Sequence, residues 1–450
     1  MLNLDPIWHR TQDFLRCCID QEESPSLWSG LVTFQLLGDE VEMKPIVIVG
    51  AGLSGLACAV TLQGHGREVL LLEASATIGG RVQTDTVDGF LLDRGFQVYL
   101  DAYPEAGEML DLAALHLRAF EPGALVFNGS KLCRVMDVFR RPKDLVSSAL
   151  APIGTIFDKL RVSVLRQKVL DLEKSEIFKR RDQSTESYLQ DFGFSVKMID
   201  TFFRSFYGGI FLERELKTSS RMFEFTFKMF SEGSATVPAK GMGEIPRQLA
   251  ARLPESAIRL KSLVSAVSAD RVVLENGEEI EASQVVVATN AAAAARLVDG
   301  FDAFEPNWRA VTNLYFEAEA SPLDGVIIAL NGTQSGRVNN VAVMSDLAPD
   351  YAPNGKALIS VSVLGENEGR DLPWVVQEEL KDWFGEKVAA WKHLRTDLIK
   401  EALPTQEETN LIGFREVGGV FVCGDHAMSA SIEGAISSGK LTAEAIVAIS

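Results

Sequence analysis

The feature that most constrains the fold is a short apolar run followed at once by a glycine-rich turn and a helical stretch. Residues 45–49 are mostly β-branched, and the hexapeptide 50–55 is Gly-Ala-Gly-Leu-Ser-Gly. The small and apolar residues of 56–62 then favour a helix. A G-x-G-x-x-G sequence between a buried strand and a helix brings backbone N–H groups of the helix N-terminus close to a pyrophosphate. The segment therefore predicts the first unit of a Rossmann-type α/β fold.

A second apolar run, 68–72, ends at Glu73, eighteen residues after Gly55. An acidic side chain at this strand end accepts hydrogen bonds from ribose hydroxyls and repels a 2′-phosphate. The alternative, a glycine-rich loop beside an unrelated surface glutamate, does not explain the order strand, turn, helix, strand. We therefore expect a dinucleotide to be bound by these residues: Gly50, Gly52, Leu53, Ser54, Gly55 and Glu73.

The residues after Glu73 extend the pattern toward one family. Residues 78–81, Ile-Gly-Gly-Arg, resemble the extended glycine-rich motif of the FAD-dependent amine oxidase superfamily, which includes monoamine oxidases, protoporphyrinogen oxidases and phytoene desaturases. A guanidinium neutralises a pyrophosphate, and glycines let the backbone approach it. The resemblance implies FAD, bound non-covalently, with Gly80 and Arg81 beside its phosphates.

Further segments resemble the same superfamily, in the same order along the chain. They are the strand and turn of 89–97, the Gly-Met-Gly of 241–243, the strands around a turn at 275–278, and a C-terminal strand that precedes a Gly-Asp pair. The resemblance implies Gly95 and Phe96 beside the isoalloxazine, Val264 at the adenine, Asp425 at the ribityl chain, and Ile432 at the helix N-terminus that faces the flavin N1–C2 edge.

The motifs lie at both ends and in the middle of the chain, so the FAD domain has to be discontinuous. We expect a Rossmann-type FAD-binding domain comprising 43–100, 236–296 and 405–450. An inserted α+β substrate domain is expected from 101–235 and 297–404. Ligand sites favour interfaces between domains, so the substrate should lie where the two meet.

Residues 1–42 lie outside the resemblance. They carry eight acidic side chains against two arginines, and they lack the basic start and apolar core of a secretory signal. We expect an N-terminal extension of unknown role, and Met43 is an alternative start of translation.

Composition disfavours several classes of protein. The net charge of −18 disfavours a nucleic-acid partner, because phosphate binding needs a basic surface. The longest apolar runs have the length of strands and fall short of the roughly 20 residues of a membrane span. The five cysteines and five histidines show neither metal-ligand spacing nor a disulfide framework. We therefore expect no metal site, reduced thiols and a cytoplasmic protein.

A run rich in phenylalanine lies in the expected substrate domain. Residues 202–230 hold eight of the 25 phenylalanines of the chain. Spacings of three and four place many of them on one helix face, so a helix core is the favoured interpretation. The alternative is an apolar tunnel for a large hydrophobic small molecule, which would make peripheral contact with a membrane plausible.

The resemblance implies an oxidoreductase that transfers hydride from a substrate C–H bond to flavin N5. Amine oxidation, the reaction after which the superfamily is named, is in doubt, because Ser431 stands where monoamine oxidases carry a tyrosine, and 313–316 lack their lysine. The alternatives are an enzyme like the carotenoid or phytoene desaturases or the protoporphyrinogen oxidases, or a non-catalytic flavin-binding protein. An NAD-dependent dehydrogenase conflicts with the motifs around Arg81 and Asp425. The pattern assigns neither a catalytic residue nor an electron acceptor.

Overall fold

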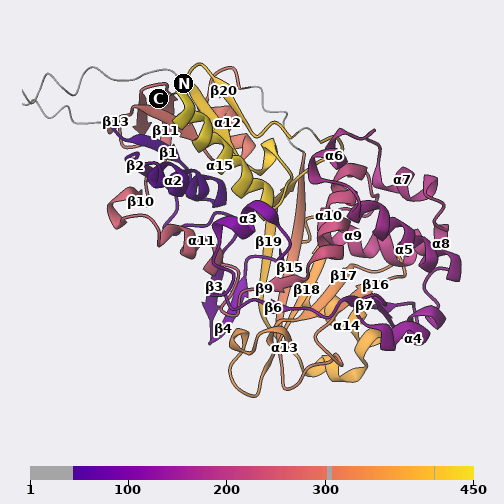
Figure 1. The fold of residues 1–450 in the computed structure, drawn as a ribbon. Helices are drawn as coiled ribbons and strands as arrows, with labels where there is room; N and C mark the ends of the chain where they lie inside the picture. The colour runs from indigo at the N-terminus through magenta and orange to yellow at the C-terminus, as the bar shows by residue number, and fades with distance from the viewer. Residues whose placement is uncertain (1–43, 302–306, 410, 450) are drawn as a thin grey trace, which may run out of the picture. The chain divides into compact units, whose positions relative to one another are not determined.

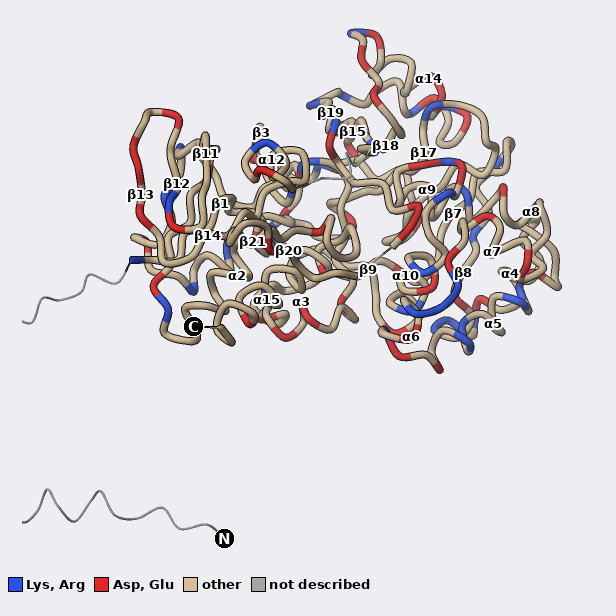
Figure 2. The backbone as a smooth tube through the Cα atoms, turned by 90° about the horizontal axis from the view of Figure 1, so that it is seen from above, with Lys and Arg blue, Asp and Glu red and all other residues tan. Residues whose placement is uncertain are grey.

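The computed structural model describes residues 44–301, 307–409 and 411–449, and two sheets organise these residues (Figure 1). The predicted N-terminal extension, 1–42, lies outside the described residues. Seen from above, the first sheet and the helices α2 and α15 lie on one side, and the second sheet with α4 to α10 lies on the other (Figure 2). Within the described residues, no helix is long and apolar enough to cross a membrane.

The first sheet is the Rossmann-type sheet that the sequence predicts. Its strand β1 (Ile46–Val49) is fully buried, because apolar residues face helices and neighbouring strands on both sides. β1 pairs in parallel with β2 and with β14. The spatial order is β10 (Ile258–Arg259), β2 (Val69–Leu72), β1, β14 (Gln284–Val287), β21 (Val420–Cys423) and an antiparallel edge strand β20 (Phe414–Val417).

Two helices from opposite ends of the chain pack on this sheet and approach each other very closely. They are α2 (Leu53–Gly64) and α15 (Ile432–Ile449). A Cβ atom added at Gly439 of α15 would lie 2.0 Å from the Ser54 carbonyl oxygen of α2, so only glycine permits this contact. Smaller elements complete this half: α3 (Pro104–Met109), α11 (Glu244–Ala250), α12 (Ala291–Leu297), the hairpin β3 (Thr84–Val87) and β4 (Phe90–Asp93), and the sheet β11 (Val264–Ser268), β12 (Arg271–Leu274) and β13 (Glu279–Glu281).

The second sheet has seven strands and is antiparallel except where β16 pairs with β7. Its order is β19 (Lys392–Pro404), β15 (Trp308–Ala318), β18 (Ala357–Leu364), β17 (Val338–Val343), β16 (Ile328–Asn331), β7 (Gly123–Phe127) and β8 (Leu132–Met136). The short α13 (Met344–Leu347) follows β17. α14 (Leu372–Phe384) packs Trp383 on the ring of Phe127, with the centroids 5.2 Å apart.

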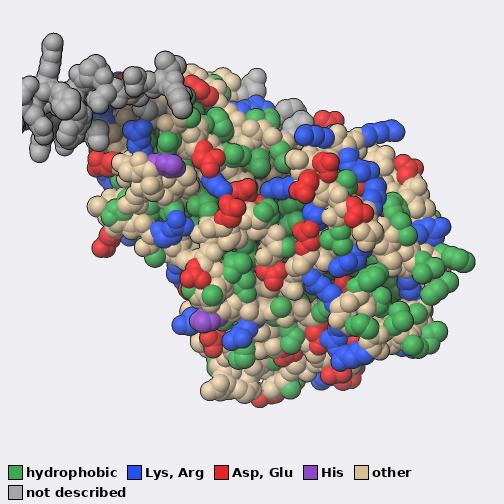
Figure 3. Space-filling model, viewed as in Figure 1, with side chains coloured by type: hydrophobic (Ala, Val, Ile, Leu, Met, Phe, Trp, Pro, Cys, Tyr) green, Lys and Arg blue, Asp and Glu red, His purple; other side chains and the backbone are tan. Residues whose placement is uncertain are grey.

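Helices from 145–232 lie beside this sheet, and α9 contacts β16 and β17. They are α4 (Leu145–Leu150), α5 (Ile156–Leu170), α6 (Lys174–Lys179), α7 (Thr185–Asp191), α8 (Val196–Met198), α9 (Arg204–Phe211) and α10 (Ser220–Glu232). A small sheet of β5 (Tyr99–Leu100), β9 (Ala235–Val237) and β6 (Arg118–Ala119) connects them to the first half. Hydrophobic side chains gather on the surface over α4 and α8 (Figure 3). The domain limits drawn from the sequence stay predictions.

Two buried carboxylates connect distant parts of the chain. Asp93 accepts hydrogen bonds from the Tyr351 hydroxyl at 2.7 Å and from the Met242 N–H at 3.0 Å. Burial raises the pKa of Asp93 to about 6, although these hydrogen bonds oppose the shift. Glu433, at the start of α15, is fully buried and forms an ion pair with Lys174 at 2.6 Å.

Candidate functional site

One cavity of about 1380 Å³ runs from the carboxyl ends of β1 and β2 into the helices beside the second sheet. Twelve of the thirteen residues that the sequence analysis assigned to the cofactor line it: Gly50, Gly52, Leu53, Ser54, Glu73, Gly80, Arg81, Gly95, Phe96, Val264, Asp425 and Ile432. These residues lie on segments up to 382 positions apart, so the fold brings the predicted set together.

Gly55, the remaining predicted residue, does not line the cavity but shapes it. A Cβ atom at Gly55 would lie 1.9 Å from the Gly50 carbonyl oxygen, so this glycine lets α2 pack directly on the turn. Gly50 itself has φ +105°, a conformation that residues with a side chain rarely adopt. The first and third glycines of the motif therefore set the distance between strand and helix.

The N-terminus of α2 is open toward the cavity. Its N-cap, Gly52, offers no side-chain cap, and the first N–H groups of a helix have no partner within the helix. The Gly79–Gly80 turn lies against it, with the Gly79 N–H donating to the Ala51 carbonyl at 2.8 Å. A Cβ atom at Gly79 would lie 2.4 Å from the Val82 carbonyl oxygen. Backbone donors therefore line this end of the cavity without side chains in front of them.

Glu73 is held in place at the end of β2. One carboxylate oxygen accepts a hydrogen bond from the Ala51 N–H and the other from the Ser75 N–H, both at 2.8 Å. Its carbonyl accepts from the Ser262 N–H at 2.8 Å, which places the start of β11, and with it Val264, beside the same region. Each carboxylate oxygen keeps a lone pair for a further donor, such as a hydroxyl.

Arg81 and Asp425 meet across the cavity. An Nη atom of Arg81 lies 2.6 Å from Oδ1 of Asp425, and the second donates to the Ala402 carbonyl at 3.3 Å. The guanidinium also lies over the Trp308 ring, 5.6 Å from its centroid. Burial on its own would lower the pKa of Arg81, but the adjacent Asp425 carboxylate raises it above the ordinary value. The site thus holds a fixed cation beside a buried carboxylate.

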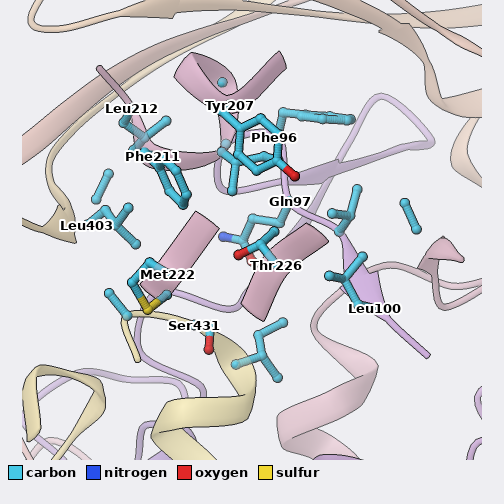
Figure 4. Close-up of a pocket in the computed structure, with 18 of the residues that line it drawn as sticks. Phe96, Gln97, Leu100, Tyr207, Phe211, Leu212, Met222, Thr226, Leu403 and Ser431 are labelled. Carbon is cyan, nitrogen blue, oxygen red and sulfur yellow. The ribbon is translucent and has the colours of Figure 1, made fainter. Parts of the chain in front are cut away.

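The far end of the cavity has an apolar lining that the motifs did not reveal. Figure 4 shows Tyr207, Phe211 and Leu212 above Met222, with Thr226 and Gln97 nearby and Ser431 at the start of α15. The ten side chains labelled there come from four regions of the chain, and none carries a charge: Phe96, Gln97, Leu100, Tyr207, Phe211, Leu212, Met222, Thr226, Leu403 and Ser431. The sequence singled out Phe96, the phenylalanine-rich run and Ser431 separately, but only tertiary packing brings them together with the other residues.

The phenylalanine-rich run serves both of the purposes that the sequence left open. Phe203 and Phe223 are buried core residues with no share in the cavity. The other six line it, including Phe225, although this ring is almost entirely buried: Phe202, Phe206, Phe211, Phe225, Phe227 and Phe230. All eight rings belong to the core beside the second sheet or pack against it, as favoured for most of them, and six also line the cavity. The reason is that α9 and α10 present one face to the core and another to the cavity.

The positions that raised doubt about amine oxidation, Ser431 and 313–316, lie at the start of α15 and in β15. The Ser431 hydroxyl accepts a hydrogen bond from the Gly434 N–H at 3.0 Å, so this residue caps α15 and offers no aromatic ring. In β15, Asn313 is buried among the hydroxyls of Ser360 and Ser362, and the side chain that lines the cavity is Val311.

The family model described as flavin containing amine oxidoreductase matches residues 53–447. The chain belongs to this family. It is therefore a flavin-dependent oxidoreductase with FAD as its cofactor, and both predictions are confirmed.

Curated relatives share shorter segments with this member of the family. Protoporphyrinogen oxidase 2 of Arabidopsis thaliana is 28% identical over 179 residues, which are 38% of this chain and 33% of the plant enzyme. Coproporphyrinogen III oxidase of Bacillus subtilis is 35% identical over 81 residues, which are 16% of this chain and 17% of that enzyme. The aligned segments thus span a third or less of these relatives.

Solved structures show the same fold along nearly the whole chain. A putrescine oxidase bound to putrescine has a TM-score of 0.69 at 17% identity, with 90% of this chain and 99% of that chain covered. A reduced UDP-galactopyranose mutase has a TM-score of 0.66 at 14% identity, with 91% and 96% covered. The predicted α/β fold with a Rossmann-type part is confirmed.

Proposed function

We propose that this flavin oxidoreductase oxidises an apolar organic substrate that is held between α9, α10 and the N-terminus of α15. The uncharged lining of this part of the cavity carries the proposal. An apolar pocket with a few polar groups binds a hydrophobic molecule well, whereas an ammonium group buried there would lack a partner for its charge. The flavin, when bound, accepts the hydride of a substrate C–H bond.

The donors and acceptors of the cavity fit FAD. Gly50, Gly52, Leu53, Ser54, Gly80 and Arg81 would hold the pyrophosphate, Glu73 the adenosine ribose, Val264 the adenine, Asp425 the ribityl chain, and Gly95, Phe96 and Ile432 the isoalloxazine. In this arrangement, Arg81 compensates both the phosphates and the buried Asp425. The N-terminus of α15 would favour negative charge on the flavin edge.

The protein contributes orientation and exclusion of water. The Tyr207 ring packs 4.6 Å from the ring of Phe223, and Phe225 stacks on Tyr103, so the walls are supported from behind. Such supported side chains hold a substrate in one orientation and keep water out of the cavity. No acid or base is assigned: the labelled side chains in Figure 4 are uncharged, and burial raises the pKa of the Tyr207 hydroxyl well above its ordinary value.

A porphyrinogen-like substrate, with an apolar ring and carboxylate arms, is a second candidate. Three cationic side chains, those of Arg140, Lys159 and Arg166, also line the cavity. Arg166 donates to the Ser231 carbonyl at 2.8 Å, and Lys159 donates to the Ala149 carbonyl at 2.7 Å, so both cations are held in place. The two porphyrinogen oxidases among the relatives point the same way.

Anaerobic reduction of the bound flavin by a panel of donors tests the proposal. We expect a polyene or a porphyrinogen to bleach the flavin absorbance and small amines to leave it unchanged. Met222→Trp should slow the bleaching at least tenfold by filling the cavity, while Trp374→Ala on exposed α14 leaves the rate unchanged. Rapid reduction of the bound flavin by an amine, in both Met222→Trp and Trp374→Ala, would contradict the proposal. Absence of flavin reduction by every donor would favour a non-catalytic flavin-binding protein.

A further inference from the structure

An unusual share of the exposed apolar side chains lies on one part of the surface. Among the described residues, fifteen large hydrophobic side chains are exposed, and nine of them lie on α4, on α5 and at positions 139 and 196. Leu150 is 79% exposed, Val146 67% and Phe157 66%. We call these nine side chains the apolar face. A contiguous group of this kind marks a site of interaction with a protein or a membrane.

Helix α5 explains how the apolar face arises. Its inner side buries Leu165 and Val169, as expected for a helix packed on a core. Its outer side carries Ile156, Leu160 and Val164 at spacings of four, where a helix facing water carries polar residues. The helix is thus apolar on two sides, and only one of them is covered by the described chain.

The charge around the apolar face is opposite to that of the whole protein. Residues 139–170 hold seven lysines and arginines against two aspartates, in a chain with a net charge of −18. Asp158 is fully buried and accepts a hydrogen bond from the N–H of Thr155, the N-cap of α5, and Asp144 forms an ion pair with Arg141 at 2.8 Å. Basic segments run along β8 and around α4 and α5 (Figure 2). Four of the seven cations pair with acidic side chains, namely Arg140, Arg141, Arg161 and Lys168. Among the described side chains, Lys143, Lys159 and Arg166 have no acidic partner, and they leave an excess of positive charge at this face.

Two lysines at the apolar face have no counterion among the described side chains. Lys143 precedes α4 and Lys197 lies in α8, and both are exposed. Basic side chains around an apolar patch attract anionic lipid headgroups by about 1 kcal/mol each. A protein partner of average composition offers no such excess of negative charge.

The cavity opens within the apolar face. Leu145, Ile156 and Leu160 are each more than half exposed, and each also lines the cavity. A molecule dissolved in the acyl region below such a face would enter the cavity past these three apolar side chains. The opening and the apolar face are thus parts of one surface.

We infer that the apolar face docks on a bilayer containing anionic lipids, and that the substrate enters the cavity from the acyl chains. The route of entry rests on the proposed apolar substrate, whereas the docking itself rests only on the exposed side chains and the surrounding charge. No described helix spans a membrane, so the contact is interfacial.

Sedimentation of the full chain, with FAD bound, on phosphatidylcholine vesicles with and without phosphatidylserine tests the docking. We expect binding that requires phosphatidylserine and weakens with salt. The pair Leu150→Asp and Phe157→Asp should lower the partition coefficient at least tenfold, and Lys143→Ala and Lys197→Ala about fivefold each. Trp374→Asp, on an equally exposed side chain of α14, is the matched control and should bind as the parent does.

Flavin absorbance and circular dichroism confirm that each variant is folded. Absence of vesicle binding, or equal losses in the apolar-face variants and the Trp374 control, would overturn the inference. A dimer in sedimentation velocity that Leu150→Asp dissociates, without vesicle binding, would instead identify the face as a contact between two copies. Flavin reduction by donors in detergent is measured separately, so a failure of the proposed substrate class leaves the docking result intact.

Discussion

Three glycines, the N-cap Gly52 of α2 and Gly55 and Gly64 within the helix, separate the effect of packing from that of cofactor binding. Gly55 has no room for a side chain, because its Cβ atom would lie 1.9 Å from the backbone oxygen of Gly50. Gly52 and Gly64 both have open space around the Cβ position, but Gly52 lines the cavity and Gly64 does not. Alanine at Gly52 therefore perturbs mainly cofactor binding, whereas alanine at Gly55 perturbs packing and, through it, cofactor binding.

The space around each added Cβ atom sets the size of the expected loss of stability or of FAD affinity. In Gly55→Ala, helix and turn must separate by about 1 Å to relieve a contact with rigid backbone, which costs about 3 kcal/mol of stability. In Gly52→Ala, the loss of the better N-cap costs about 1 kcal/mol at most. Its methyl group, however, lies where a phosphate would approach the helix, and a penalty of about 2 kcal/mol weakens FAD binding about 30-fold.

Gly64→Ala is the control, because alanine in a helix is slightly favoured over glycine. Apoprotein is prepared from each variant, its stability is measured by urea unfolding, and its FAD dissociation constant is measured by quenching of flavin fluorescence. We expect Gly55→Ala to lose both stability and FAD, Gly52→Ala to lose mainly FAD, and Gly64→Ala to lose neither. FAD binding by Gly52→Ala within twofold of the parent would refute the placement of the pyrophosphate at this helix.

Three further outcomes are expected. Lys174→Met leaves the buried Glu433 carboxylate without its cation and should lower the free energy of unfolding in urea by about 3 kcal/mol. Glu433→Gln should lower it less, because the Lys174 side chain that it leaves behind reaches solvent. Equal losses in the two variants would argue against the ion pair. The pKa of Asp93 is raised to about 6 by burial, so the folded state binds its proton more tightly than the unfolded chain does, and the stability that this provides is lost as pH rises through 6. Between pH 5 and pH 7 the loss is about 1 kcal/mol, and Asp93→Asn should not show it. Acid precipitation should release all of the flavin, because the cofactor is predicted to be non-covalently bound; yellow precipitated protein would contradict this.

Much of the flavin half could be predicted from the sequence because its signals are local. The strand before Gly50, the glycine spacing through Gly55 and the acidic residue at 73 act within one βαβ unit, where backbone geometry demands particular residue types. The apolar runs at 45–49 and 68–72 likewise predicted strands, and β1 and β2 lie within them. A local pattern of apolar residues is sufficient to predict short buried strands of this kind.

Twelve of the thirteen residues predicted for the cofactor also share one cavity, which spacing along the chain alone does not demonstrate. The ion pair of Arg81 and Asp425 joins residues 344 positions apart. Resemblance to the superfamily identified each residue separately, but not their contact. That contact depends on the pairing of β14 with β21 and on the packing of α2 against α15.

By itself, the sequence determined the Rossmann-type part and the dinucleotide motif, because each depends on short-range patterns of glycine, apolar and acidic residues. The identity of the cofactor was implied by the resemblance to the superfamily. Tertiary structure alone decided the substrate half. The side chains of Tyr207, Met222 and Leu403 form one wall only after α9, α10 and β19 have packed together. Likewise, which apolar side of α5 is buried and which stays exposed depends on what the rest of the chain covers, and no periodicity within the helix contains that information.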